Sequence, residues 1–112
     1  MQHEDKIRLQ HILDEANEIL KFIEDYSFDD FVGDSKTVHA VIRAIEVIGE
    51  AASKLSKEYK NKNRHIPWNQ IIGMRNHLIH VYFDIDHDTV WKTVQEDIPN
   101  LIIMIKPLLD GI

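Results

Sequence analysis

The chain has 112 residues, of which 44% are hydrophobic and 29% charged, and its formal net charge is −6. This length fits a single domain spanning residues 1–112, and the composition is that of a globular protein, not a disordered or fibrous one. The lack of cysteine excludes a disulfide scaffold, a zinc ribbon and a cysteine nucleophile. The longest apolar run, 101–105, is far below the ~18 residues of a membrane span, and the N-terminus lacks a secretory signal pattern. We therefore expect a cytoplasmic protein with no membrane association.

Apolar residues recur at spacings of three and four along most of the chain, which predicts amphipathic helices. We expect a first helix over 4–25 and a second over 34–59, with Asp34 or Ser35 as the capping residue of the second. Between them, residues 26–33 interrupt the period. Small residues on the second helix would let another helix approach closely; they are Ala44, Gly49, Ala51 and Ala52.

A third helix is predicted over 67–82, because Pro67 suits the first position of a helix. A fourth helix is predicted over 90–105, preceded by aspartates that can cap it. Pro99 removes a backbone donor and crowds the preceding turn, so we expect it to kink or split this last helix. The sequence therefore predicts an all-α fold, an antiparallel bundle of four or five helices.

Common metal and phosphate-binding motifs are incomplete in this sequence. The glycines are solitary, and no glutamate has a histidine three residues further on. The string Asp84-x-Asp86-x-Asp88 lacks the glycine and the bidentate glutamate of a calcium loop, so we interpret these aspartates as helix caps. We predict no metal and no cofactor.

The densest cluster of polar functional groups lies within residues 73–82. On a continuous helix Asn76 and His80 share one face with His77 beside them, and Arg75 lies about 140° round from His80. An imidazole and a guanidinium would meet on one phosphate if the helix is distorted or if a second copy of the chain contributes, which predicts a homodimeric site.

This pair of side chains suits cleavage of an RNA phosphodiester. Histidine exchanges protons near neutral pH, so His80 would take the proton of a ribose 2′-hydroxyl or give one to the leaving 5′-oxygen. Arginine matches phosphate oxygens, so Arg75 would stabilise their charge, and Asn76 would orient the imidazole or the substrate.

Plainer interpretations of the same residues stay open. Arg75 could pair with a neighbouring carboxylate, and His80 could be a satisfied histidine at the surface. His77 and His80 could be half of a metal site, although the sequence identifies no further ligands. Tyr82 could be a packing residue at a helix end.

A basic segment, residues 54–65, carries a net charge of +4 and leaves −10 for the remainder of the chain. It is either a solvated helix end with its loop, or a rim that tracks RNA phosphates toward Arg75. The candidate RNA contacts in it are Lys57, Lys60, Lys62 and Arg64.

Three strings carry a resemblance to a known family: Ile66-Pro67-Trp68, Gly73-Met74-Arg75-Asn76 and Arg75-x4-His80-x-Tyr82. Over nearly its whole length the chain resembles HEPN-domain ribonuclease toxins of the HepT-like type. The resemblance implies a metal-independent endoribonuclease that is the toxin of a toxin–antitoxin pair. It also implies a dimer in which two Arg-x4-His motifs meet in a cleft, with Arg75 and His80 as catalytic residues.

The resemblance further implies regulation through Tyr82. The antitoxin partner would be a minimal nucleotidyltransferase that adds adenylyl groups to Tyr82, and the added phosphate charge would repel RNA. Two alternatives remain. One is a non-catalytic helical module that docks a nucleotidyltransferase and binds a nucleotide, and the other is a structural dimer built on the small residues of the second helix.

Overall fold

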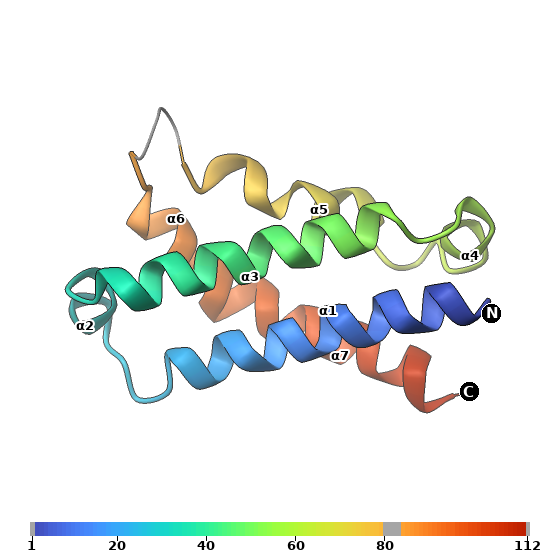
Figure 1. Ribbon diagram of the computed structural model, residues 1–112, viewed down its shortest axis with the longest axis horizontal. Helices are drawn as coiled ribbons and strands as arrows, with labels where there is room; N and C mark the ends of the chain where they lie inside the picture. The colour runs from blue at the N-terminus through green and yellow to red at the C-terminus, as the bar shows by residue number, and fades with distance from the viewer. Residues whose placement is uncertain (1, 80–83, 112) are drawn as a thin grey trace.

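The computed structural model describes residues 2–79 and 84–111, and this part of the chain forms a helical bundle (Figure 1). The long helices are α1 (His3–Phe22), α3 (Ser35–Ser53) and α7 (Ile98–Asp110). Helices α1 and α3 run antiparallel, α7 packs against α1, and the two termini lie at the same end of the bundle (Figure 1). The predicted all-α architecture is confirmed. Among the helices described, none is both long enough and apolar enough to span a lipid bilayer.

The core forms where the predicted apolar stripes of the three long helices meet. Each stripe repeats at spacings of three and four residues, so its side chains lie on one face and leave water together. The fully buried large side chains include Leu9, Ile12, Ile19, Ile45, Ile48, Leu101 and Ile105. The helical period in the sequence therefore located the core correctly.

A short helix, α2 (Phe28–Val32), lies between α1 and α3 where the sequence predicted only an interruption. A capping box stabilises it: the Ser27 hydroxyl accepts from the Asp30 N–H and the Asp30 carboxylate accepts from the Ser27 N–H. Five residues are too few to show a helical period, which is why periodicity missed this helix. The predicted cap of the next helix is confirmed, because the Asp34 side chain accepts from the Thr37 N–H.

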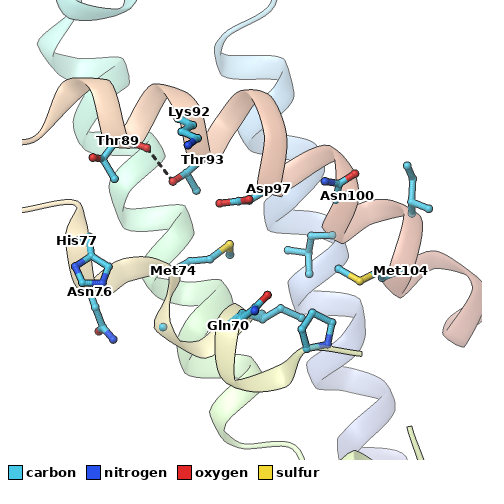
Figure 2. A pocket seen from close by; sticks show the side chains of 15 residues that line it. Gln70, Met74, Asn76, His77, Thr89, Lys92, Thr93, Asp97, Asn100 and Met104 are labelled. Carbon is cyan, nitrogen blue, oxygen red and sulfur yellow. Dashed lines mark hydrogen bonds between the residues drawn. The ribbon is translucent and has the colours of Figure 1, made fainter. Parts of the chain in front are cut away.

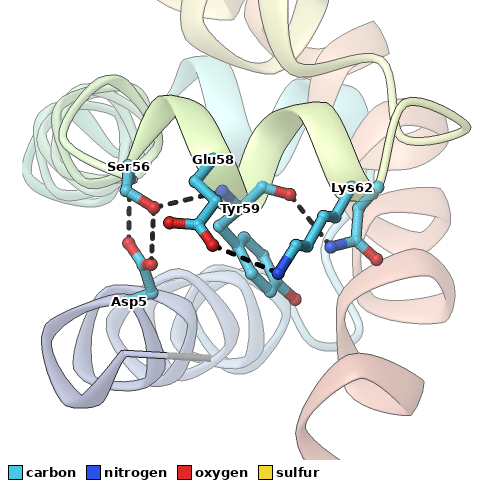
Figure 3. Close-up of polar contacts among 6 residues, drawn as sticks. Asp5, Ser56, Glu58, Tyr59 and Lys62 are labelled. Atoms are coloured by element: carbon cyan, nitrogen blue, oxygen red, sulfur yellow. Dashed lines mark hydrogen bonds and ion pairs between the residues drawn. The ribbon is translucent and has the colours of Figure 1, made fainter.

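The predicted continuation of the second helix to residue 59 is wrong. Helix α3 ends at Ser53, and a separate helix, α4 (Lys57–Lys62), follows. Ser56 caps α4, and the buried Asp5 of α1 accepts hydrogen bonds from the Ser56 N–H (2.8 Å) and hydroxyl (2.7 Å), as Figure 3 shows. This contact, which spans 51 positions in the sequence, fixes the break between the two helices.

The predicted third helix is also shorter than expected. Helix α5 (Trp68–Gly73) packs against α3 and tightens into a 3₁₀ segment, η1 (Met74–His77). Beyond η1 the Leu78 carbonyl accepts from the Asp86 N–H (2.8 Å), and Ile79 forms a β-bridge with Ile85. The prediction of one helix over 67–82 is therefore wrong, and with it the argument that Asn76 and His80 share a helix face.

The last helix is distorted at the position that Pro99 predicted. Helix α6 (His87–Lys92), capped by Asp86, passes through a π-helical segment, η2 (Thr93–Asp97), into α7. Pro99 lacks the N–H that an α-helix needs, and the widened turn before it accommodates that loss. The expected disturbance near Pro99 is thus found as a π-helical segment, but the helix is not split: the helical run of 87–110 is unbroken and longer than expected.

Candidate functional site

Arg75 lies in η1 and faces helix α3. Its Nη1 is 3.7 Å from Oε2 of Glu50, whose Oε1 is 3.1 Å from Nζ of Lys54. The hydrogen bond and charge of Lys54, followed by the charge of Arg75, lower the pKa of the Glu50 carboxyl. The plainer interpretation of Arg75 as the partner of a carboxylate is thus confirmed. The arginine side chain is 37% exposed, and exposed ion pairs are weak, so its guanidinium can still exchange this carboxylate for a phosphate.

Gly49 lets η1 lie close to α3 at this point. A Cβ at Gly49 would lie 3.1 Å from the Ile72 carbonyl oxygen and 3.5 Å from Cδ of Arg75. The predicted close approach at the small residues of this helix is therefore confirmed at Gly49. Its lack of a side chain sets how near the Arg75 stem comes to α3.

Asn76 and His77 face the other side of η1. They line an open groove of about 910 Å³ between α5–η1 and the run from α6 to α7 (Figure 2). Successive residues of a 3₁₀ helix are about 120° apart, so η1 turns Arg75 toward α3 and its two neighbours toward the groove. Asn76 and Arg75 therefore face different sides of η1, in keeping with the prediction that Arg75 lies away from the helix face of Asn76.

His80 and Tyr82 lie outside the described residues. The chain on either side of 80–83 is brought together, since Ile79 pairs with Ile85. The assignments of His80 as a catalytic residue and of Tyr82 as a regulatory residue therefore stay predictions.

Three of the four candidate RNA contacts lie together. Lys57, Lys60 and Arg64 line a second hollow of about 530 Å³, and this hollow shares Pro67 and Gln70 with the groove. Lys62, in contrast, is not part of the hollow and forms an ion pair with Glu58 (3.1 Å; Figure 3).

Both tryptophans serve packing. The buried Trp68 donates its Nε1–H to the Asn63 carbonyl (3.1 Å) and lies 6.2 Å from the ring of Tyr59. Trp91 packs against Phe28 and Phe31, with ring centroids 6.1 and 5.2 Å away. Neither indole is a platform for base stacking.

Sequence reasoning missed several side chains around the site. Glu50 directly follows Gly49, where a close helix approach was predicted. This position was the one feature of the sequence that could have indicated Glu50 as a neighbour of the site. Lys92, Asp97 and Asn100 line the groove opposite η1, and only the fold brings them there. Partial burial, followed by the charge of Glu96, raises the pKa of Asp97, while Lys92 lowers it.

Residues 12–108 match a family model described as ribonuclease HepT-like. The chain belongs to the HepT-like family. A putative RNase of Methanocaldococcus jannaschii is 40% identical over 96 residues, which cover 86% of this chain and 88% of that protein. A putative RNase of Caldanaerobacter subterraneus subsp. tengcongensis is 40% identical over 101 residues, 90% of each chain.

A third relative of this HepT-like protein is the probable ribonuclease HepT of Thermococcus cleftensis. It is 43% identical over 101 residues, which cover 90% of this chain and 92% of the relative. No solved structure matches the chain significantly. Membership of the HepT-like family confirms the predicted family and supports the predicted class of enzyme, a ribonuclease.

Proposed function

We propose that this HepT-like protein is a metal-independent endoribonuclease and the toxin of a toxin–antitoxin pair. The observation that carries the proposal is the partly exposed side chain of Arg75, held on a tight turn against α3, whose ion-pair partner among the described residues is an exposed carboxylate. A permanent cation in that setting is available to a phosphate.

The chemistry assigns one role to each side chain. His80 takes the proton of the ribose 2′-hydroxyl, the 2′-oxygen forms a bond to phosphorus, and the bond from phosphorus to the 5′-oxygen breaks. The leaving 5′-oxygen receives a proton, so the products are a 2′,3′-cyclic phosphate and a 5′-hydroxyl. Arg75 stabilises the charge on the phosphate oxygens during this step. Asn76, proposed from the sequence to orient the reacting groups, acts from the groove side of η1.

A homodimer completes the proposed site. One imidazole does not readily act as base and acid in a single step, so two copies of His80 divide these tasks. Two copies of Arg75 in the same cleft would also raise the local positive charge, in a chain whose net charge is −6.

Regulation is proposed to act at Tyr82, through a partner nucleotidyltransferase that serves as antitoxin. Adenylylation adds a phosphate two residues from His80 and repels the RNA backbone. After co-expression with a neighbouring nucleotidyltransferase, intact mass should show adenylyl increments that map to Tyr82. Increments on another residue, or none, would contradict this part of the proposal.

The chemistry is tested with RNA in EDTA. The purified protein should cut a short RNA and leave a 2′,3′-cyclic phosphate, and one 2′-deoxy substitution at the cut position should abolish that cut. Cleavage that needs a divalent metal, or that continues at the 2′-deoxy position, would overturn the proposed mechanism.

A second candidate function is a non-catalytic module that docks a nucleotidyltransferase and binds a nucleotide. The groove of about 910 Å³ favours it, because its volume suits a small ligand. This candidate expects nucleotide binding without RNA turnover in the same assay.

A further inference from the structure

The groove between α5–η1 and the α6–α7 run combines an apolar floor with polar walls. The floor includes Met74 and Met104, and the walls carry the amides of Gln70 and Asn100 (Figure 2). An apolar floor edged by groups that both donate and accept hydrogen bonds suits a nucleobase, whose faces are apolar and whose edges are polar.

The polar wall groups are free to bind a ligand. Within the part of the chain that the structure describes, the side chains of Gln70, Asn100 and Lys92 make no hydrogen bond or ion pair with protein groups. Polar groups that converge on a concave apolar surface without structural partners are typical of a ligand site.

The charges of the groove fit one orientation of a nucleotide. Lys92 and Asp97 both line the wall opposite η1 and lie five positions apart, across the π-helical segment η2. The ammonium attracts a phosphate and the carboxylate repels one, so the phosphate lies toward Lys92 and the base toward Asp97. A carboxylate also accepts hydrogen bonds from the exocyclic amines of bases.

The groove continues into the basic hollow beside α4. Pro67 and Gln70 line both, so a strand leaving the groove passes directly onto Lys57, Lys60 and Arg64. The two hollows together give a path with a base-sized apolar groove at one end and three cations at the other.

We propose that the groove is a nucleotide subsite for single-stranded RNA, and that the strand runs from it onto the α4 cations. This inference rests on the proposed function and deepens it, since it names where the substrate lies relative to η1. Asn76 and His77, which line the groove, follow Arg75 directly in the chain.

A second copy of the chain is the rival occupant. Ile103 on the rim is 69% exposed, and an exposed isoleucine beside an apolar floor also suits a protein interface. The free amides, Lys92 in the groove and the three cations of the adjoining hollow favour RNA, because the core of a protein interface is depleted of lysine.

The test measures binding of a short fluorescein-labelled single-stranded RNA in which fluorine replaces every 2′-hydroxyl, so that no cleavage occurs. Lys92→Ala and Asn100→Ala should each weaken binding roughly fivefold to tenfold by fluorescence anisotropy. Lys106→Ala and Gln95→Ala are matched controls. They are exposed residues of the same helical run that do not line the groove, and they should bind as the parent does.

Light scattering on the same samples measures the mass in solution, and so shows whether the groove binds RNA or a second copy of the chain. Unchanged mass together with the weakened binding supports the subsite. Binding equal to that of the controls, or loss of a dimer in the Lys92 and Asn100 variants, would overturn it. The subsite and the proposed function can fail separately. If the parent cuts no RNA but the Lys92 and Asn100 variants bind it more weakly, the proposed function fails and the subsite stands. If the parent cuts RNA and these variants bind it as the parent does, only the subsite is rejected.

Discussion

The core of α1, α3 and α7 and the groove face of α5–η1 and α6–η2 are built on opposite principles. In the core, large apolar side chains of all three long helices are fully buried, among them Leu9, Ile45 and Leu101. On the groove face the helix narrows to 3₁₀ in η1 and widens to π in η2, and polar side chains point into open space.

This contrast separates the part of the molecule that stabilises the fold from the part available for binding. Short 3₁₀ and π segments inside longer helices often mark functional sites, and here both lie along one groove. Changes in the core should therefore alter stability, and changes on the groove face should alter RNA handling with little effect on stability.

The largest effect on stability is expected from Phe31→Ala. Phe31 is 0% exposed and packs against Trp91, so its removal leaves a cavity and should cost about 3–5 kcal/mol of unfolding free energy. Phe22→Ala, at a phenylalanine that is 39% exposed, is the control and should cost much less in the same urea titration. Equal losses would mean that the core is wrongly placed.

Asp5→Ala should break the link between α1 and α4. Asp5 is 3% exposed and satisfies two groups of Ser56, so we expect a loss of about 1–3 kcal/mol. Asp14→Ala, which removes an exposed carboxylate of α1, should stay within about 0.5 kcal/mol. Thermal melts of both variants check this, and a stable Asp5→Ala protein would contradict the contact.

Gly49→Ala should disturb both the core and the groove face, since it pushes α5–η1 away from α3. A new methyl group 3.1 Å from the Ile72 carbonyl should cost about 1–3 kcal/mol and slow RNA cleavage by shifting Arg75. Gly73→Ala meets only the flexible Asn76 side chain and should be neutral or stabilising by up to about 1 kcal/mol. Parent-like stability and cleavage in Gly49→Ala would show that the close approach has no role.

Glu50→Gln sharpens the comparison by changing RNA handling alone. Removing the carboxylate 3.7 Å from Arg75 leaves the guanidinium free for phosphate, so RNA should bind about twofold to threefold more tightly at low salt. Glu46→Gln, one turn earlier on the exposed side of α3, is the control. Weaker RNA binding by Glu50→Gln than by this control would refute competition between the carboxylate and the phosphate.

The smallest expected effect is a change in thermal stability on replacing Asp97. Because its pKa is raised, the ionised carboxylate is less stable in the folded protein than in the unfolded chain. Its penalty is absent in acid and develops as pH rises through the raised pKa. Asp97→Asn should therefore raise the Tm by roughly 1–3 °C at neutral pH, and the difference should vanish at about pH 3. A lower Tm of Asp97→Asn than of the parent at neutral pH would contradict a destabilising carboxylate at this position.

The sequence predicted what depends on local periodicity and failed where distant residues decide. The apolar periods of the first, second and last predicted helices predicted the fold class and the core, and Pro99 predicted the disturbance of the last helix. The end of α3 depends on Asp5, more than 50 positions from Ser56, and no local pattern reveals it. Local sequence predicted that the third helix continues to residue 82. In the structure it ends near His77, because Ile79 pairs with Ile85.

The site was predicted in part for the same reason. Arg75 was found through its motif, and its alternative pairing with a carboxylate was foreseen without naming Glu50. The groove was not foreseen, because its opposite wall comes from residues 89–104 and meets η1 only in the folded chain.

The rate of RNA cleavage in EDTA by Arg75→Ala and His80→Ala, each beside the parent, tests the central claim most directly. We expect each variant to lose at least about 100-fold in rate while its helicity and mass in solution match those of the parent. Cleavage at the parent's rate by either folded variant would contradict the assignment of this pair as the reacting groups.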